Sequence, residues 1–281
     1  MLILAFDTTS EKGGVGVFRD AECLAFVSHE GSANQYSVSL FELVERVLAL
    51  SHLELRQIDV YGAANGPGSF TGIRIGLAAA RAWGRAFDRP VRGVSILQAM
   101  VNKRELDTRG SRLVTRDARL AETPVCRPGR LEGEQAPASQ ESCGPDWYFP
   151  ILDARRSEFY LGNFRRIPSG SASVTGQDYE HADAGWLLKP EALAALLEER
   201  LKSGERGICL VRAHDHPAAE LRACLPGSLE WQAIEGTLVD SIADIAWKRE
   251  QSNRPCLPAE LDAYYIRRPD AETHLDSAPR R

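Results

Sequence analysis

The stretch NGPGSFTGIRIGLAAARAWG, residues 65–84, carries the strongest structural signal in this chain. Glycine and proline at 66–68 predict a tight turn, and Ser69 or Thr71 can cap a helix that begins directly after it. The residues that follow predict a helix over about 70–87. The turn raises one question, which is whether these glycines hold a phosphate or let another segment come close.

Two common phosphate-binding patterns are absent from the stretch. A P-loop needs a lysine after its last glycine to neutralise phosphate, but no lysine lies between Lys12 and Lys103. The dinucleotide pattern Gly-x-Gly-x-x-Gly also fails, because Thr71 stands where its third glycine would be. The stretch therefore predicts a contact helix rather than a phosphate loop.

Small residues recur at every fourth position of the predicted helix and so lie along one ridge of it: Gly72, Gly76, Ala80 and Gly84. Each helical glycine costs about 0.5–1 kcal/mol relative to alanine, which makes sense where another backbone approaches closely. Apolar side chains cover most of the remaining circumference. The polar strip is narrow and consists of Arg74, Arg81 and Arg85. Such a helix is buried on nearly all sides.

A second helix, predicted over 35–50, is also more apolar than its own sheet requires. Two helices with excess apolar surface favour a helix–helix interface with a partner protein. A larger core within the chain itself is the alternative. The residues predicted for the interface are Tyr36, Leu40, Leu43, Val47, Gly72, Ile73, Gly76, Leu77, Ala80 and Trp83.

Strands alternate with these helices and indicate an α/β fold. An N-terminal lobe is expected over 1–103, an irregular insertion or linker over 104–146, a C-terminal lobe over 147–272 and a disordered tail over 273–281. In the second lobe, strands flank a hairpin turn at 153–156, a strand covers 207–212, and a helix at 237–250 is expected to pack back on the first lobe. No repeat is visible by eye, so any repeat of the lobes would be structural.

Composition excludes several classes of protein. The net charge of −5 argues against a general polyanion binder, although a local basic patch stays possible. The six cysteines are scattered without a Cys-x-x-Cys pair, which favours reduced thiols in the cytoplasm. No run is long enough to span a membrane, and the N-terminal residues are typical of a strand rather than a signal peptide. No Ser/His/Asp or Cys/His arrangement stands out. His214 and His216 lack a third metal ligand and are interpreted as part of a solvated loop.

Several segments resemble the TsaB (YeaZ) family, the dimerisation subunit of the bacterial tRNA threonylcarbamoyladenosine machinery. They are LAFDTTS, NGPGSFTGIRIGLAAARAWG, GVSILQAM, ILDARRSEFY and YYIRRPDAE. The resemblance covers 1–103 well, 147–165 fairly and 264–269 weakly. It implies the two-lobed α/β fold of actin, Hsp70 and sugar kinases, with a mixed sheet flanked by helices in each lobe. It also implies that helices 35–50 and 70–87 pair with those of a catalytic paralogue, TsaD, or of a second copy.

The resemblance further implies a non-catalytic partner subunit. This subunit supports formation of N6-threonylcarbamoyladenosine at position 37 of tRNAs that read A-starting codons. The implied partners are TsaD, a TsaE-like ATPase and tRNA contacted through the complex, with a homodimer in isolation. TsaD carries two metal-binding histidines four residues apart, and Ile96 and Met100 stand at the matching positions here. An isoleucine and a thioether cannot replace imidazole for such an ion, so no metal site is expected. No catalytic residue is assigned.

One further constellation resembles a ligand site. Asp7, Thr8, Thr9 and Ser10 occupy the place where kinases of this fold hold their first phosphate loop. Their hydroxyl groups and turn amides could grip phosphate, and the carboxylate could hold Mg²⁺ through water. ATP or ADP with Mg²⁺ at the complex interface is therefore open, as is a strand end with a side-chain-capped turn. A stand-alone ATPase or kinase and a metallopeptidase-like protein of the same superfamily are the alternative functions.

Overall fold

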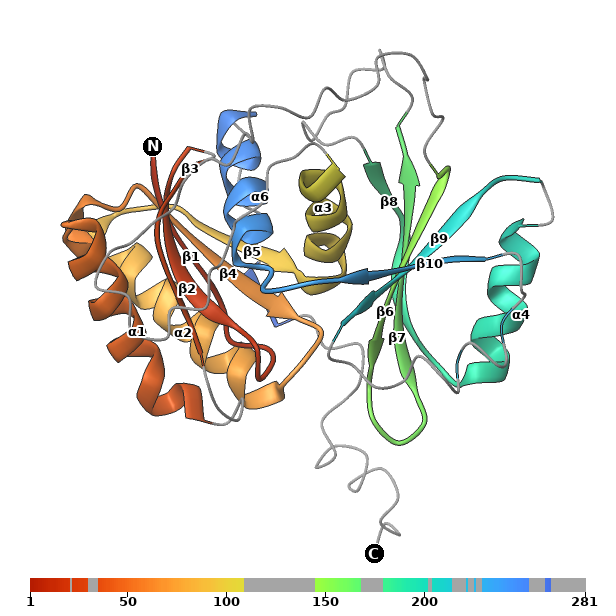
Figure 1. Cartoon of the computed structure of the whole chain (residues 1–281). Helices are drawn as coiled ribbons and strands as arrows, with labels where there is room; N and C mark the ends of the chain where they lie inside the picture. Colours follow the sequence, from red (N-terminus) through yellow and green to blue (C-terminus); the bar gives the residue numbers. More distant parts are fainter. Residues whose placement is uncertain are drawn as a thin grey trace, which may run out of the picture.

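The structure is a computed structural model with two lobes, each built on a five-stranded sheet (Figure 1). It describes residues 1–20, 22–29, 35–108, 145–167, 179–201, 204–213, 221, 225, 229–252 and 261–263.

The first sheet has the order β3-β2-β1-β4-β5. Its strands are β1 (Leu2–Asp7), β2 (Gly14–Arg19), β3 (Glu22–Ser28), β4 (Val60–Gly66) and β5 (Val91–Ser95). Strands β1, β2 and β3 form an antiparallel meander, whereas β4 runs parallel to β1 and β5 parallel to β4. The sheet is therefore mixed, as the family resemblance implied.

The second sheet repeats this topology with the order β8-β7-β6-β9-β10. Its strands are β6 (Trp147–Asp153), β7 (Phe159–Arg166), β8 (Tyr179–Leu188), β9 (Gly207–Arg212) and β10 (Glu230–Ile234). Strands β6 to β8 are antiparallel, and β9 and β10 continue in parallel from β6. The two lobes thus share one architecture, with β6 in the place of β1.

Helices separate and cover the two sheets (Figure 1). Helices α1 (Tyr36–Ser51) and α2 (Phe70–Phe87) pack on the outer face of the first sheet. Helix α4 (Pro190–Leu201) covers the outer face of the second, and a single 3-10 turn, η2 (Leu55–Gln57), precedes β4. Between the sheets lie α3 (Ile96–Thr108) and α6 (Val239–Gln251), which contact each other. Although α6 follows the second sheet in sequence, it packs against β1 and β4 of the first.

Local signals explain where α2 begins and ends. The Ser69 hydroxyl oxygen accepts a hydrogen bond from the Gly72 amide at 3.3 Å, which satisfies one free donor of the first turn. At the other end, Asp88 adopts a left-handed conformation with φ of 52°, and its amide bonds back to Gly84. The helix predicted over 70–87 is confirmed at both ends, as is the strand predicted over 207–212.

The predicted boundary at residue 104 is wrong for the first residues of the insertion. Residues 104–108 are helical and form the last turns of α3. Side-chain contacts hold this end, because Arg104 pairs with Glu105 at 2.7 Å and the Tyr148 hydroxyl donates to the same carboxylate at 2.7 Å. Residues 109–144 lie outside the described residues, as do His214, His216 and the chain beyond residue 263.

The largest core cluster lies between the two sheets and joins both lobes through α3 and α6. A second cluster fills the space under α1 and α2, and a third lies under α4. Within the described residues, no helix is long and apolar enough to cross a membrane.

Candidate functional site

The end of strand β1 forms a buried polar cluster at the predicted phosphate loop. Asp7 is fully buried, and its Oδ1 accepts hydrogen bonds from the Thr9 amide at 2.8 Å and the Thr9 hydroxyl at 2.6 Å. The Thr8 hydroxyl donates to the Gly72 carbonyl of α2 at 2.7 Å. These two hydroxyl groups therefore hold the turn and the helix together rather than face a ligand. Ser10 is half-buried, and its Oγ has no hydrogen-bond partner.

Strand β6 of the second lobe ends in the same kind of turn. The Asp153 carboxylate accepts a hydrogen bond from the Arg155 amide at 2.6 Å, just as Asp7 accepts one from the amide two residues on. The Ala154 amide closes the hairpin onto the Glu158 carbonyl at 2.9 Å. The hairpin turn predicted at 153–156 is confirmed, and it occupies the position in its sheet that Asp7 to Ser10 occupy in theirs.

An arginine from the second lobe reaches Asp7. Arg212, the last residue of β9, places its Nη2 at 3.5 Å from the free Oδ2 of Asp7, and both side chains are buried. The buried Tyr36 hydroxyl, at the start of α1, lies beside the same group, close to Gly13. Burial, followed by the Asp7 charge, raises the pKa of Tyr36 well above its ordinary value, so its hydroxyl stays protonated.

This arrangement does not fit the nucleotide with Mg²⁺ that the sequence left open as a ligand of Asp7 to Ser10. The Asp7 carboxylate faces a guanidinium instead of an open space for a hydrated cation, and the hydroxyl groups of Thr8 and Thr9 are used within the fold. No group of three or more His, Cys, Asp or Glu side chains among the described residues could hold a metal ion.

The ten residues predicted for the partner interface lie in this protein's own core. Each is at least nine-tenths buried in the isolated chain, and all but the two glycines belong to the apolar cluster under α1 and α2. They therefore offer almost no surface to a partner. This burial favours the alternative of a larger intramolecular core for these positions.

The glycine ridge packs against the same chain. A Cβ at Gly72 would overlap the Thr8 carbonyl oxygen, and one at Gly76 would lie 2.5 Å from the Thr8 Oγ1. At Gly84 a Cβ would meet Val91 and the Arg89 carbonyl. The backbone that approaches α2 so closely is therefore the end of β1 and the start of β5.

The opposite face of these helices carries exposed apolar side chains that are not among the ten residues predicted for the partner interface. Val38 is 70% exposed, Phe41 53% and Phe70 36%. Phe41 stands edge-on to Trp83, with 5.9 Å between the ring centroids. The sequence could have indicated the exposure of Val38 and Phe41, because helical spacing places them outside the arc that faces the sheet.

Charges of opposite sign surround this outer face. Helix α1 exposes Glu42, Glu45 and Arg46, whereas α2 exposes Arg74, Arg81 and Arg85. Arg81 meets a carboxylate of its own chain, since its Nη2 lies 3.0 Å from Asp262 Oδ1 and also donates to the Leu261 carbonyl. The segment 261–263 therefore lies against α2.

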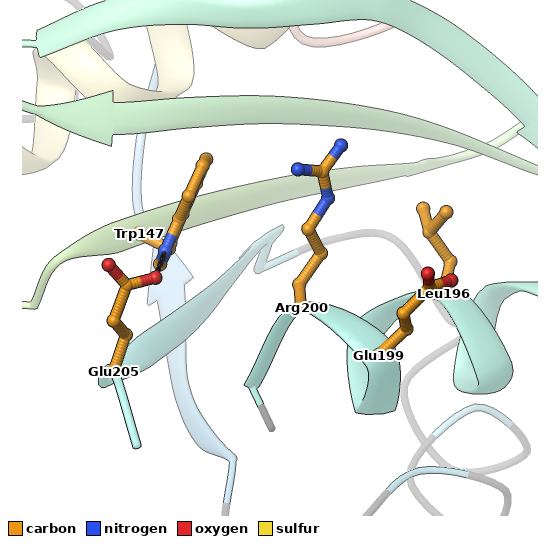
Figure 2. A pocket seen from close by; sticks show the side chains of 5 residues that line it. All are labelled: Trp147, Leu196, Glu199, Arg200 and Glu205. Carbon is orange, nitrogen blue, oxygen red and sulfur yellow. Dashed lines mark hydrogen bonds between the residues drawn. The ribbon is translucent and has the colours of Figure 1, made fainter. Parts of the chain in front are cut away.

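The second lobe contains a separate surface hollow of about 440 Å³ (Figure 2). Its lining is formed by Trp147, Leu196, Glu199, Arg200 and Glu205. Figure 2 shows the Arg200 side chain standing between Trp147 and Leu196. The Trp147 indole donates to Glu205, which also pairs with Arg165 at 3.2 Å. None of the residues predicted from sequence lines this hollow.

Comparison with known proteins points to one group of relatives. Residues 27–132 match the family model described as TsaD: tRNA N6-adenosine threonylcarbamoyltransferase. The tRNA threonylcarbamoyladenosine biosynthesis protein TsaB of Escherichia coli is 31% identical over 123 residues, which are 43% of this chain and 52% of that protein. The TsaB protein of Bacillus subtilis is 27% identical over 167 residues, 58% of this chain and 71% of that protein. The match thus spans about half the length of the Escherichia coli relative.

A solved structure shares the fold over nearly the whole chain. YeaZ from Pseudomonas aeruginosa superposes with a TM-score of 0.62 at 17% identity and covers 94% of this chain and 100% of that one. This likeness concerns the fold alone. Together with the repeated sheet topology, it identifies the two-lobed α/β fold of the actin type.

Proposed function

We propose that this chain, which the similarities above support as a member of the TsaB (YeaZ) family, is a non-catalytic partner subunit of a tRNA threonylcarbamoyl transferase. In that role it supports a TsaD-like paralogue that forms N6-threonylcarbamoyladenosine at position 37 of tRNAs reading A-starting codons. The relatives named TsaB are the observation that carries the proposal, because two of them match 43% and 58% of this chain at 31% and 27% identity.

The non-catalytic role is supported by the chemistry of two positions in α3. Ile96 and Met100, where the paralogue has its metal-binding histidines, are both fully buried in the apolar core between the lobes. Neither offers a nitrogen, oxygen or thiolate donor, so these positions do not fit the iron or zinc ion of the paralogue. The transferase chemistry is therefore assigned to the partner.

The outer face of α1 and α2 is proposed as the partner surface. Val38 and Phe41 supply apolar area at its centre, and Glu42 and Glu45, two of the three exposed charges of α1, can pair with arginines of α2. When two copies pair around a two-fold axis, the α1 of one can face the α2 of the other, so opposite charges meet. The same surface would serve a TsaD-like partner in the complex and a second copy in isolation.

Further components follow from the same proposal. A TsaE-like ATPase would join the pair, and tRNA would be bound by the assembled complex rather than by this chain alone. The net charge of −5 is in keeping with a subunit that does not hold a polyanion by itself.

The experiment is reconstitution of the modification reaction. The chain is co-expressed with the TsaD-like protein of the same organism, and threonylcarbamoyladenosine in tRNA is measured by mass spectrometry with and without this chain. We expect co-purification, and modification only when both are present. Modification by this chain alone, or by the paralogue alone at an unchanged rate, would contradict the proposal.

A further inference from the structure

The contact between Asp7 and Arg212 joins the two lobes directly. Asp7 ends β1 of the first sheet, and Arg212 ends β9 of the second. Their side chains are 0% and 3% exposed, with 3.5 Å between Nη2 and Oδ2. Two unit charges taken out of water need a partner, and here each one finds it in the other lobe.

The pair is held mainly by charge. Asp7 Oδ1 is occupied by Thr9, but Oδ2 has no hydrogen-bond partner, and neither does Nη2 of Arg212. Charge attraction between the lobes, rather than hydrogen-bond geometry, is therefore what holds these two side chains together.

We propose that Asp7 and Arg212 form an interlobe latch, in which the arginine of the second lobe takes the place of a ligand and holds the two lobes closed. The cation that neutralises Asp7 is then part of the protein. Closure of this end of the molecule depends on Arg212, whereas the other connection, through α3 and α6, fixes the middle.

The latch predicts that loss of the Arg212 charge increases local opening at the ends of β1 and β9. When Arg212 loses its charge, Asp7 stays buried without compensation, and the least costly response is to admit water between the ends of β1 and β9. The amides of residues 7–10 and 211–213 should then exchange faster, because exchange reports local opening. The rest of each lobe, held by its own core, should keep its protection.

The test uses hydrogen exchange and small-angle scattering on the full chain. Arg212→Met should speed exchange at residues 7–10 by about tenfold or more and increase the radius of gyration, and Arg212→Lys should lie between it and wild type. Arg165→Met is the matched control, because it removes a more exposed ion pair within one lobe and should change neither quantity. Unchanged exchange at residues 7–10 in a folded Arg212→Met protein would overturn the latch.

A second variant covers the case in which Arg212→Met does not fold. Asp7→Asn combined with Arg212→Met removes both charges, so no buried charge is left without a partner. We expect it to fold and to show exchange at residues 7–10 that is faster than in wild type, because the attraction is lost, but slower than in Arg212→Met, because no buried charge drives opening. Wild-type protection in the double variant would show that the charges do not hold the lobes together. Neither readout involves a partner protein, so failure of the latch and failure of the proposed function are distinguishable.

Discussion

At the scale of single residues, Gly72 and Gly76 set how closely α2 approaches the end of β1. The Gly72 carbonyl accepts a hydrogen bond from the Thr8 hydroxyl, and any side chain at Gly76 would overlap that hydroxyl. The glycines bring a helix and a strand end of one chain into contact. Their cost in helix propensity is offset by this packing and by the hydrogen bond that it permits.

Gly76→Leu should therefore destabilise the isolated protein, not only its assembly. Overpacking of this kind costs about 1–3 kcal/mol, partly offset by the better helix propensity of leucine. Urea unfolding followed by circular dichroism measures the difference. Ala78→Leu, at an exposed position of the same helix, is the control and should unfold close to wild type. Equal unfolding midpoints for Gly76→Leu and wild type would show that the contact is not tight.

Cys209 gives a second residue-scale prediction, on alkaline stability. Burial raises the pKa of this thiol from 9.0 to about 12. The Cys209 thiol thus loses its proton near pH 9 in the unfolded chain but keeps it in the folded chain. Its contribution to the free energy of unfolding is therefore fully present below pH 9 and is lost as pH rises toward 12. The slope reaches about 1.4 kcal/mol per pH unit. Cys209→Ala should unfold with a shallower pH dependence between pH 9 and 10, which chemical denaturation at several pH values measures. Parallel curves for the two proteins would contradict this assignment.

At the scale of elements, α1 and α2 have two faces with different tasks. The inner faces complete the core of the first lobe. The outer faces carry Val38, Phe41 and charged side chains of both signs, and they are the surface that we propose for the partner. The excess apolar character read from the sequence thus divides between the core, which takes most of it, and a smaller exposed patch.

Val38→Glu should weaken association while leaving the fold intact. Val38 is 70% exposed, so the substitution removes no core contact, but it places a charge in the apolar centre of the proposed surface. We expect the dissociation constant for a second copy or for the TsaD-like partner to rise about tenfold or more, which corresponds to about 1.4 kcal/mol. Analytical ultracentrifugation measures it. Ala182→Glu, exposed on β8 of the other lobe, is the control. Equal dissociation constants for the two variants would place the interface elsewhere.

At the scale of the whole molecule, α3 and α6 hold the lobes together through buried polar pairs as well as apolar contacts. Lys103 of α3 pairs with Asp240 of α6, and Asn102 donates to Asp244 at 2.9 Å. Asp244 also pairs with Lys248 at 2.7 Å. Because such pairs tolerate few alternative alignments, they specify how the two helices, and through them the two sheets, are oriented.

Lys103→Met should destabilise the whole protein by about 3–5 kcal/mol, because it leaves the buried Asp240 carboxylate without its main partner. Burial already raises the pKa of Asp240, and Lys103 opposes that rise. Without the lysine, the pKa of Asp240 in the folded protein rises further above 3.8. The loss of stability relative to wild type is therefore present at neutral pH and shrinks as pH falls toward 3.8. Differential scanning calorimetry at pH 4.5 and 7 measures this.

The control for this prediction is the double variant Lys103→Met with Asp240→Asn. It removes the unpaired charge and should recover most of the lost melting temperature at pH 7. A deficit in the single variant that is equal at both pH values would show that lost packing of the lysine stem, not the uncompensated carboxylate, is the cause.

Several features of the fold were determined by local sequence. The span of α2 follows from Ser69 at its start and the turn at Asp88, but the prediction that it is buried on nearly all sides was wrong, because Arg74, Arg81 and Arg85 share an exposed face with small residues. The turn at 153–156 and the strand over 207–212 likewise follow from patterns of a few neighbouring residues. Because these patterns involve only neighbouring residues, the features can be predicted without the tertiary structure.

What only the tertiary structure decided is which residues meet across the chain. The same glycine ridge suits a partner's backbone or the protein's own, and the fold showed that Thr8 covers it. Asp7 and Arg212 are separated by most of the sequence, and no periodicity relates them, yet the repeated sheet topology brings the ends of β1 and β9 together. Contacts between distant segments depend on the packing of whole sheets and helices, and the pattern of a single segment does not contain that information.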